Sequence, residues 1–203
     1  MNTWILFLIV GILIIIGLVY IFTKSSSNFK NTKYVNKDGY FKHLPSVKKH
    51  PNSKKELSKV YQAIKSRTKK DEYFFSLTDV DLYKPFQQLL KQNGYNYSEK
   101  ELNSILQEPH KKIIGLKKYY NRIRPYQLDK NIDMLKTKTG YTPSYPAGHA
   151  YQAYYLSKHL YKKHPALKQQ LLEISDRIDK TRVMGGIHYP SDGKFSRKLV
   201  LGH

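Results

Sequence analysis

Three short blocks of polar residues constrain the fold of this chain most strongly, because their side chains suit a single chemistry only if they meet in space. The blocks lie between residues 117 and 192. They contain Lys117 and Arg124, then Gly148 and His149, then Arg182, His188 and Asp192. Any fold that brings them together must close a long stretch of chain around one small site.

The cations of these blocks suit a phosphoryl group. A phosphomonoester carries up to two negative charges, and fixed cations can hold it against water. Arg124 and Arg182 each offer a planar fork for two phosphate oxygens, whereas Lys117 offers a compact point charge. We therefore expect these three side chains to form a phosphate cradle.

The two histidines suit nucleophilic attack and protonation. A neutral imidazole can displace an alkoxide from phosphorus, while a second, protonated imidazole gives its proton to the leaving oxygen. We expect His188 to attack, because Asp192 follows four residues later and can hold the proton of its Nδ1. His149 is then the general acid. Pro190 predicts that this segment is a turn leading into a helix.

Gly148 and His149 precede a stretch with helical composition, residues 150–162, that contains neither Gly nor Pro. This pattern places both residues at a helix N-terminus, where free backbone N–H groups and the helix dipole attract anions. Gly148 would let a phosphate approach the backbone closely.

These blocks resemble those of the type 2 phosphatidic acid phosphatase superfamily, Lys-x6-Arg-Pro, Pro-Ser-Gly-His and Ser-Arg-x5-His-x3-Asp. The sequences Lys118-Tyr-Tyr-Asn-Arg-Ile-Arg-Pro125, Ser144-Tyr-Pro-Ala-Gly-His149 and Gly186-Ile-His-Tyr-Pro-Ser-Asp192 look most like the class A bacterial non-specific acid phosphatases. The resemblance covers roughly residues 70–200. It implies a phosphohistidine on His188 and phosphate binding with neither a metal nor a cofactor.

Two positions depart from the family pattern. Ala147 replaces the serine of Pro-Ser-Gly-His, and Thr181 replaces the serine before Arg182. Losing a hydroxyl donor to a charged group costs about 1.5–3 kcal/mol, which corresponds to roughly tenfold to a hundredfold in affinity or rate. We expect Ala147 to weaken activity rather than abolish it, and Thr181 to be nearly neutral.

An uninterrupted run of apolar residues and glycine, Trp4 to Phe22, carries no charge and is long enough to span a bilayer. We expect residues 1–24 to be a single transmembrane anchor or uncleaved signal, 25–53 a basic polar linker, and 54–203 a helical phosphatase-like domain. Lysines after the run favour a cytoplasmic domain. Relatives of the resembled class act outside the cytoplasm, so the side of the membrane stays open.

The rest of the chain predicts an all-α bundle, which the resemblance makes one of the acid phosphatase and vanadium haloperoxidase type. Apolar residues recur at helical spacing, and sustained two-residue alternation is absent from the sequence. The expected helices are Glu56–Arg67, Asp79–Gln92, one starting at the Ser98–Glu101 capping box, Lys111–Arg122, Ala150–Lys162 and one starting at Pro165.

The primary hypothesis is a membrane-anchored phosphomonoesterase whose substrate is a soluble or a lipid phosphate ester. The enzymatic alternative is a vanadium-dependent haloperoxidase. A second alternative is a catalytically impaired basic module that binds nucleic acid or acidic lipid, because the net charge is +21. Nucleic acid is the less favoured partner, since no nucleic-acid motif is present. The oligomeric state stays open.

Overall fold

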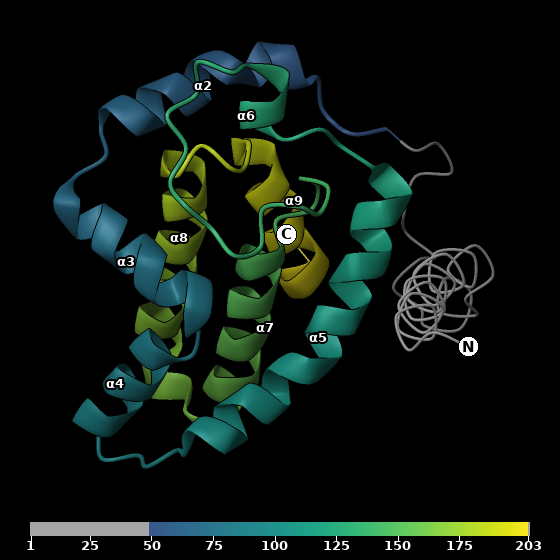
Figure 1. The fold of residues 1–203 in the computed structure, drawn as a ribbon. Coiled ribbons are helices and arrows are strands. Elements are labelled where there is room, and N and C mark those ends of the chain that lie inside the picture. The colour runs from purple at the N-terminus through teal and green to yellow at the C-terminus, as the bar shows by residue number, and fades with distance from the viewer. Residues whose placement is uncertain (1–48, 203) are drawn as a thin grey trace, which may run out of the picture. The chain divides into compact units, whose positions relative to one another are not determined.

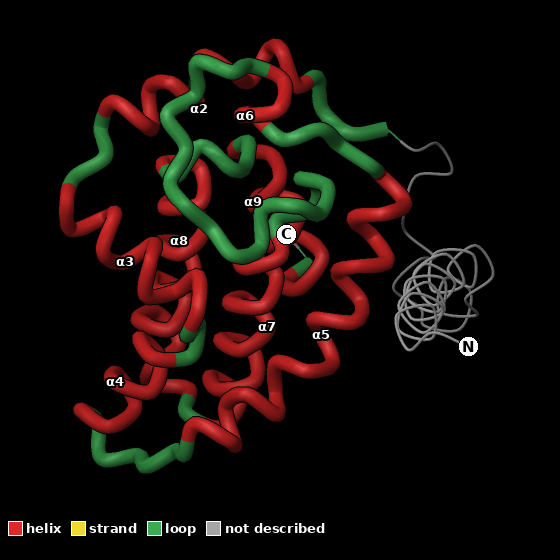
Figure 2. Tube along the Cα trace, in the orientation of Figure 1, coloured by secondary structure: helices red, strands yellow, loops and turns green. Residues whose placement is uncertain are grey.

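A computed structural model describes residues 49–202, and every regular element within that range is a helix (Figures 1 and 2). The elements are α2 (Ser53–Lys65), α3 (Lys69–Val80), α4 (Lys84–Gln92), α5 (Glu99–Tyr120), α6 (Pro125–Leu128), α7 (Gly148–Lys163), the 3-10 helix η3 (Pro165–Leu167), α8 (Lys168–Met184) and α9 (Pro190–Leu201). The all-α prediction is confirmed for this part of the chain.

Local sequence signals set several helix starts. Ser98 accepts from the backbone N–H of Glu101 and the Glu101 side chain accepts from the N–H of Ser98, so the predicted capping box begins α5. An equivalent box between Thr68 and Asp71 begins α3. This second box was not predicted, because it leads into a helix with weak apolar periodicity.

Two predicted helices were wrong in extent. The expected helix Asp79–Gln92 is split, because α3 ends at Val80 and α4 starts at Lys84. Pro85 explains the break: proline has no N–H and its ring clashes with the preceding turn, so it fits only the first turn of α4.

The expected helix Lys111–Arg122 is instead the second half of α5. It stops at Tyr120, where Asn121 takes a left-handed conformation with φ of 48°. Arg122 and Arg124 therefore lie beyond the helix, on a loop that can turn them inward.

Helix α7 is the centre of the bundle and packs against α5, α8 and α9 (Figure 1). Its inward residues Ala153, Leu156 and Leu160 join the main hydrophobic core. The other buried members are Phe74, Leu82, Tyr83, Phe86, Leu90, Leu102, Leu106, Leu167, Leu171 and Ile178. This core holds α7 and α8 side by side and so fixes the ends of both helices relative to each other.

Those ends bring the polar blocks to one place. Figure 1 shows that the C-terminal ends of α5 and α8 and the N-terminal ends of α7 and α9 lie at the same end of the bundle. Each of the predicted site residues lies at or just beyond one of these ends. A bundle mouth of this kind is a common place for a small-ligand site.

The predicted anchor, residues 1–24, and most of the predicted linker lie outside the described residues. Among residues 49–202, no helix has both the length and the apolar character needed to cross a bilayer.

Candidate active site

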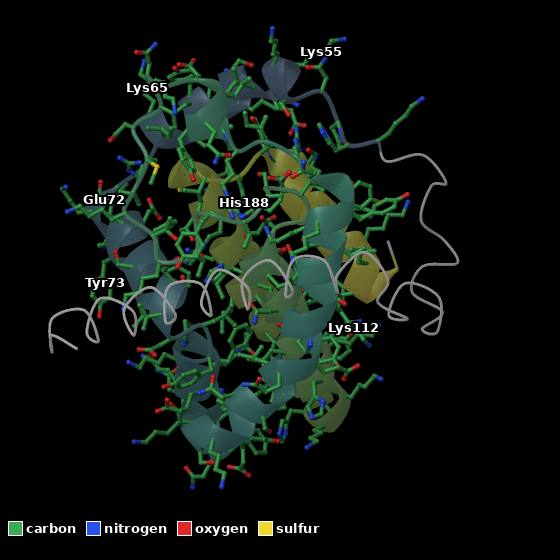
Figure 3. The ribbon with its side chains drawn as sticks, turned by 45° about the vertical axis from the view of Figure 1, so that its right-hand side comes forward. Lys55, Lys65, Glu72, Tyr73, Lys112 and His188 are labelled. Carbon is green, nitrogen blue, oxygen red and sulfur yellow. The ribbon has the colours of Figure 1, made fainter. Side chains whose placement is uncertain are left out.

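The structure brings all seven predicted site residues to the same end of the bundle. Lys117 lies in the last turn of α5, Arg124 directly before α6, Gly148 and His149 at the start of α7, Arg182 in the last turn of α8, His188 in the loop after it, and Asp192 in the first turn of α9. Most of their side chains are buried. His188, labelled in Figure 3, lies inside the bundle.

The imidazole of His188 is held by the carboxylate of Asp192. Nδ1 of His188 is 2.9 Å from Oδ2 of Asp192, and because a carboxylate only accepts, Nδ1 carries the proton. Tyr189 is the N-cap of α9 and Pro190 its first residue, so the segment is the predicted turn into a helix. Gly186, with φ of 70°, turns the chain tightly after α8.

The Asp192 carboxylate accepts hydrogen bonds from four donors. Besides His188, these are the hydroxyl of Ser144, the backbone N–H of Tyr189 at 2.9 Å and Nη1 of Arg122 at 2.7 Å. Burial alone would raise the pKa of Asp192, but the His188 hydrogen bond and the charge of Arg122 lower it. Asp192 is therefore ionised, and it fixes the orientation and tautomer of His188.

The second nitrogen of His188 faces the cations. Its Nε2 lies 3.4 Å from Nη1 of Arg124. Burial first, and then the positive charge of Arg124, lower the pKa of His188, although Asp192 acts in the opposite direction. The ring is thus neutral, with its Nε2 lone pair directed towards the place where a phosphate could bind.

Arg124 and Lys117 are buried cations that contact carbonyl groups. Arg124 donates to the carbonyls of Thr142 at 2.7 Å and Ile187 at 2.8 Å, and Lys117 donates to that of Pro143 at 2.6 Å. Within residues 49–202 neither of them forms an ion pair with a carboxylate. Burial lowers the pKa of both, and for Lys117 the charge of Arg124 lowers it further.

Arg182 is anchored by α3. Its terminal nitrogens donate to Asp79 Oδ1 at 2.8 Å, Phe75 O at 2.9 Å and Thr78 Oγ1 at 2.7 Å. Its Nε is also buried but has no hydrogen-bond partner among the described residues. Burial lowers the pKa of Arg182 to about 10, although Asp79 acts to raise it. The guanidinium is therefore held in place by three hydrogen bonds, and its Nε is the one donor left without a partner among the described residues.

His149 lies at the start of α7 and is less buried than His188, with 13 % of its side chain exposed. The N-cap residue Ala147 offers no side-chain acceptor to the first-turn N–H groups. A Cβ added at Gly148 would lie 3.3 Å from Cε of Lys117, so the helix start and that cation are in close contact. An anion at this helix start would meet both.

The two histidines belong to one electrostatic unit. Burial is the main reason that the pKa of His149 lies well below its ordinary value, and the charges of Arg182, His188 and Lys117 lower it further. A bound phosphate would counteract these cations and raise the pKa of His149. Taken together, the site gathers buried cations and two imidazoles at one end of the bundle, and such a group can hold a tetrahedral dianion.

Sequence reasoning missed three residues of this site. Asp79 binds Arg182 and lies 3.8 Å from Nε2 of His149. Arg122 and Ser144 both bind Asp192. Arg122 lies within the first segment that resembles the family, and Ser144 begins the second. The family resemblance could therefore have identified both residues, whereas Asp79 lies far from every block.

The two departures from the family pattern occupy different surroundings. Ala147 is fully buried, and its N–H donates to the carbonyl of Asp192 at 3.1 Å. The Thr181 hydroxyl donates to the carbonyl of Ile178 at 3.0 Å, within its own helix. Ala147 therefore lies against the site, whereas the described partner of Thr181 is structural.

A further acid, Asp179 of α8, is partly buried against Gly193 of α9. A Cβ on Gly193 would come within 1.8 Å of Asp179 Oδ1, so only glycine leaves room for this carboxylate. Oδ1 is buried and without a hydrogen-bond partner in the described chain. Burial first, and then the negative charges of Asp192 and Asp176, raise the pKa of Asp179 to about 7.

Comparison with known proteins supports the predicted fold. The chain resembles the crystal structure of the first transmembrane PAP2 type phosphatidylglycerolphosphate phosphatase from Bacillus subtilis, with a TM-score of 0.51 and 17 % identity over 73 % of this chain and 80 % of that one. No family model and no curated protein matches. The type 2 phosphatidic acid phosphatase fold is thus supported, while the finer likeness to class A acid phosphatases stays a prediction.

No group of three or more His, Asp or Glu residues that could hold a metal ion is present between residues 49 and 202.

Replacing Arg122 tests how the site is held together. Arg122→Ala leaves the buried carboxylate of Asp192 and the partly buried carboxylate of Glu56 without their shared cation, so we expect a loss of about 3–5 kcal/mol in the free energy of unfolding. Urea denaturation measures it. Arg197→Ala is the control: it removes an exposed pair with Asp176, and we expect a change of about 1 kcal/mol or less. Equal losses would show that the Arg122 pair is not a buried anchor.

The Asp179 carboxyl predicts a pH-dependent stability. Its pKa in the folded protein lies above the ordinary value of 3.8. Its contribution to the free energy of unfolding is therefore full below pH 3.8 and is lost as the pH rises through about 7. Asp179→Asn removes this loss. We expect the free energy of unfolding of the variant, relative to that of the wild type, to increase by roughly 1–3 kcal/mol from pH 5 to pH 9 in urea denaturation. Glu173→Gln, which replaces an exposed acid of the same helix, is the control, and a gap for Asp179→Asn that does not change with pH would contradict the prediction.

Proposed function

We propose that this protein is a membrane-anchored, metal-independent phosphomonoesterase that works through a phosphohistidine on His188. The observation that carries the proposal is the neutral imidazole of His188, whose Nε2 lies 3.4 Å from a buried arginine while Asp192 holds its Nδ1 proton. A nucleophile held in one tautomer beside fixed cations is what attack on a phosphate dianion requires.

In the first step, Nε2 of His188 attacks phosphorus and the bond from phosphorus to the ester oxygen breaks. Lys117, Arg124 and Arg182 stabilise the charge on the other phosphate oxygens, and the backbone N–H groups at the start of α7 assist them. His149 gives its proton to the leaving oxygen, so that an alcohol departs. The products of this step are a phosphohistidine and neutral His149.

In the second step, a water molecule attacks the phosphohistidine. His149, now neutral, takes a proton from that water, and the bond between phosphorus and nitrogen breaks. Inorganic phosphate leaves, His188 returns to its starting state, and His149 is protonated again. Asp192 stays ionised throughout and stabilises the positive charge that forms on the His188 ring.

The low pKa of His149 couples substrate binding to proton uptake. The residue is neutral at pH 7 because burial and the neighbouring cations outweigh the effect of Asp79, and a phosphate dianion raises its pKa towards protonation. Catalysis by this route therefore becomes faster as the pH falls below neutrality, as in an acid phosphatase.

Residues 4–22 are proposed to anchor the domain in a membrane, because their apolar length matches a bilayer. The phosphatase of similar fold is described as a transmembrane enzyme acting on phosphatidylglycerolphosphate. A phosphate ester, either lipid-borne or soluble, is thus the proposed substrate class.

Hydrolysis of a chromogenic phosphate monoester by the full-length chain tests the function. We expect His188→Ala to lower kcat at least a thousandfold, because the nucleophile is lost, and His149→Ala to lower it about 10²–10⁴-fold. His159→Ala, on the same helix as His149, is the matched control and should keep full activity. A folded wild type that is no faster than His188→Ala would refute the proposal.

The same assay separates the haloperoxidase alternative. Vanadate should inhibit a phosphatase, since it occupies the phosphate cradle. Halide oxidation by the vanadate-loaded chain in the presence of peroxide would instead support the alternative.

Ala147→Ser should raise activity. The added hydroxyl lies at the N-cap of α7 and offers the phosphate one more donor, so we expect kcat/KM to rise about tenfold to a hundredfold. Ala147→Gly adds no hydroxyl and serves as the control. An unchanged kcat/KM in a folded Ala147→Ser protein would show that the backbone donors already suffice.

A further inference from the structure

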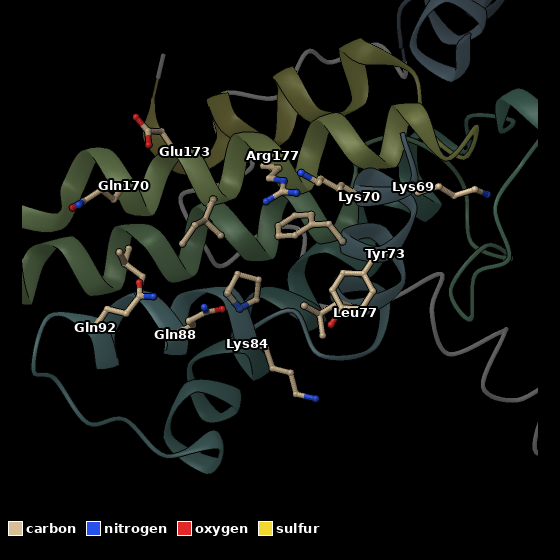
Figure 4. A pocket seen from close by; sticks show the side chains of 14 residues that line it. Lys69, Lys70, Tyr73, Leu77, Lys84, Gln88, Gln92, Gln170, Glu173 and Arg177 are labelled. Atoms are coloured by element: carbon tan, nitrogen blue, oxygen red, sulfur yellow. The ribbon is translucent and has the colours of Figure 1, made fainter. Parts of the chain in front are cut away.

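A wide groove lies between α3, α4 and α8, and none of the seven predicted site residues lines it (Figure 4). Its volume is about 1060 Å³, which exceeds the usual size of a pocket for one small molecule. The side chains that line it come from one face of each of the three helices. An open groove of this kind suits an extended surface better than a single small ligand.

The charges along the groove are unevenly distributed. Lys69, Lys70, Lys84 and Arg177 line it, whereas Glu173 is its one acidic lining residue. In Figure 4, Lys70 and Arg177 point towards each other, while Glu173 lies with the glutamines at the other end. Two like charges facing each other create a local site for an anion.

Some of these cations are already paired. Lys69 binds Glu72 at 2.8 Å and Lys84 binds Asp81. Lys70 and Arg177 form no ion pair with a carboxylate of the described residues, and the carboxylate of Asp71 is occupied by the N-terminal cap of α3. Lys70 and Arg177 are therefore the cations available to an external anion.

The rest of the groove is apolar. Phe74 lies under the guanidinium of Arg177, with the Arg177 Cζ 4.0 Å from the ring centroid. Leu77, Leu89 and Ile174 continue the lining, and the ring of Tyr73 stands at its edge with 72 % of the residue exposed. Tyrosine is typical of the boundary between water and lipid, where its ring is partly buried and its hydroxyl stays hydrated.

We propose that this groove docks the domain onto a membrane surface that contains anionic phospholipids. Lys70 and Arg177 bind lipid phosphates, while Tyr73 and the apolar lining contact the acyl-chain boundary. The inference concerns a surface without any predicted catalytic residue, and it does not depend on the chemistry of His188.

Charge and tethering favour a lipid surface over other anionic partners. A nucleic-acid surface would use stacked aromatics along a basic track, whereas this groove combines one exposed aromatic ring with an aliphatic lining. Lysine or arginine near an anionic membrane contributes about fivefold in binding for each residue. A chain whose N-terminal segment is proposed to enter the bilayer also keeps the groove at high effective concentration near the lipid.

The test uses the full-length chain reconstituted in vesicles. Tyr73→Trp in a Trp4→Phe background places a single tryptophan at the groove, since Trp4 is the chain's one native tryptophan. Brominated phospholipids quench a tryptophan that reaches the acyl chains. We expect strong quenching in vesicles of phosphatidylcholine with phosphatidylglycerol and at least fivefold less in phosphatidylcholine alone.

Removing the two available cations should abolish this difference. The pair Lys70→Gln and Arg177→Gln is expected to lower quenching in anionic vesicles at least fivefold, with glutamine keeping part of the stem over Phe74. The matched control, Lys162→Gln and Lys198→Gln, changes net charge equally on exposed positions of α7 and α9 and should have no such effect.

Hydrolysis of the soluble chromogenic ester is measured in parallel. It should be unchanged in both pairs, which shows that the variants are folded and keeps this proposal separate from the catalytic one. Equal quenching with and without phosphatidylglycerol, an equal loss in the control pair, or release of the tryptophan from the lipid by added nucleic acid would each overturn the proposal. If the wild type proves inactive, the quenching experiment still decides the docking question.

Discussion

The hydrogen bonds to the Asp192 carboxylate are the interaction on which the rest of this structure depends. A buried ionised carboxylate is unstable unless donors replace the lost water, and here four donors from different segments do so. Arg122 lies in the loop after α5 and Ser144 in the loop before α7. His188 and Tyr189 lie in the turn before α9. The hydrogen bonds that satisfy this one charge therefore join the three segments and also orient the imidazole of His188.

The cations beside Asp192 are buried, although burial disfavours a charged side chain. Lys117 and Arg124 are held by carbonyl oxygens rather than by carboxylates, so their charges stay available to a ligand. Arg182 differs, because Asp79 neutralises part of its charge while Nε remains unbonded among the described residues. Buried cations without carboxylate partners make a site less stable than an apolar core of the same size. Such a loss of stability is typical of sites that bind an anion.

The sequence predicted well that the polar blocks converge, but it predicted poorly which residues hold them in place. Spacing was enough for His188 and Asp192, because a turn that leads into a helix sets their separation locally. It was not enough for Arg122, whose burial depends on Glu56, a residue 66 positions earlier that reaches it only in the folded chain. Asp79 was likewise not predicted, since it lies far from every block in the sequence and meets Arg182 only in the folded chain. The helix interiors were predictable because their apolar periodicity is local, whereas their ends followed capping boxes and prolines.

The difference in burial between the two histidines indicates the direction from which a substrate enters. His188 is almost fully enclosed, whereas 13 % of the His149 side chain is exposed. In the proposed mechanism, an ester that places its phosphate against His188 leaves its alcohol portion on the more exposed side, near His149. That mechanism requires attack and departure on opposite sides of phosphorus, because phosphoryl transfer proceeds in line. Under the proposed function, the buried groups contact the phosphate, so discrimination between esters comes from the outer surfaces that the alcohol portion meets.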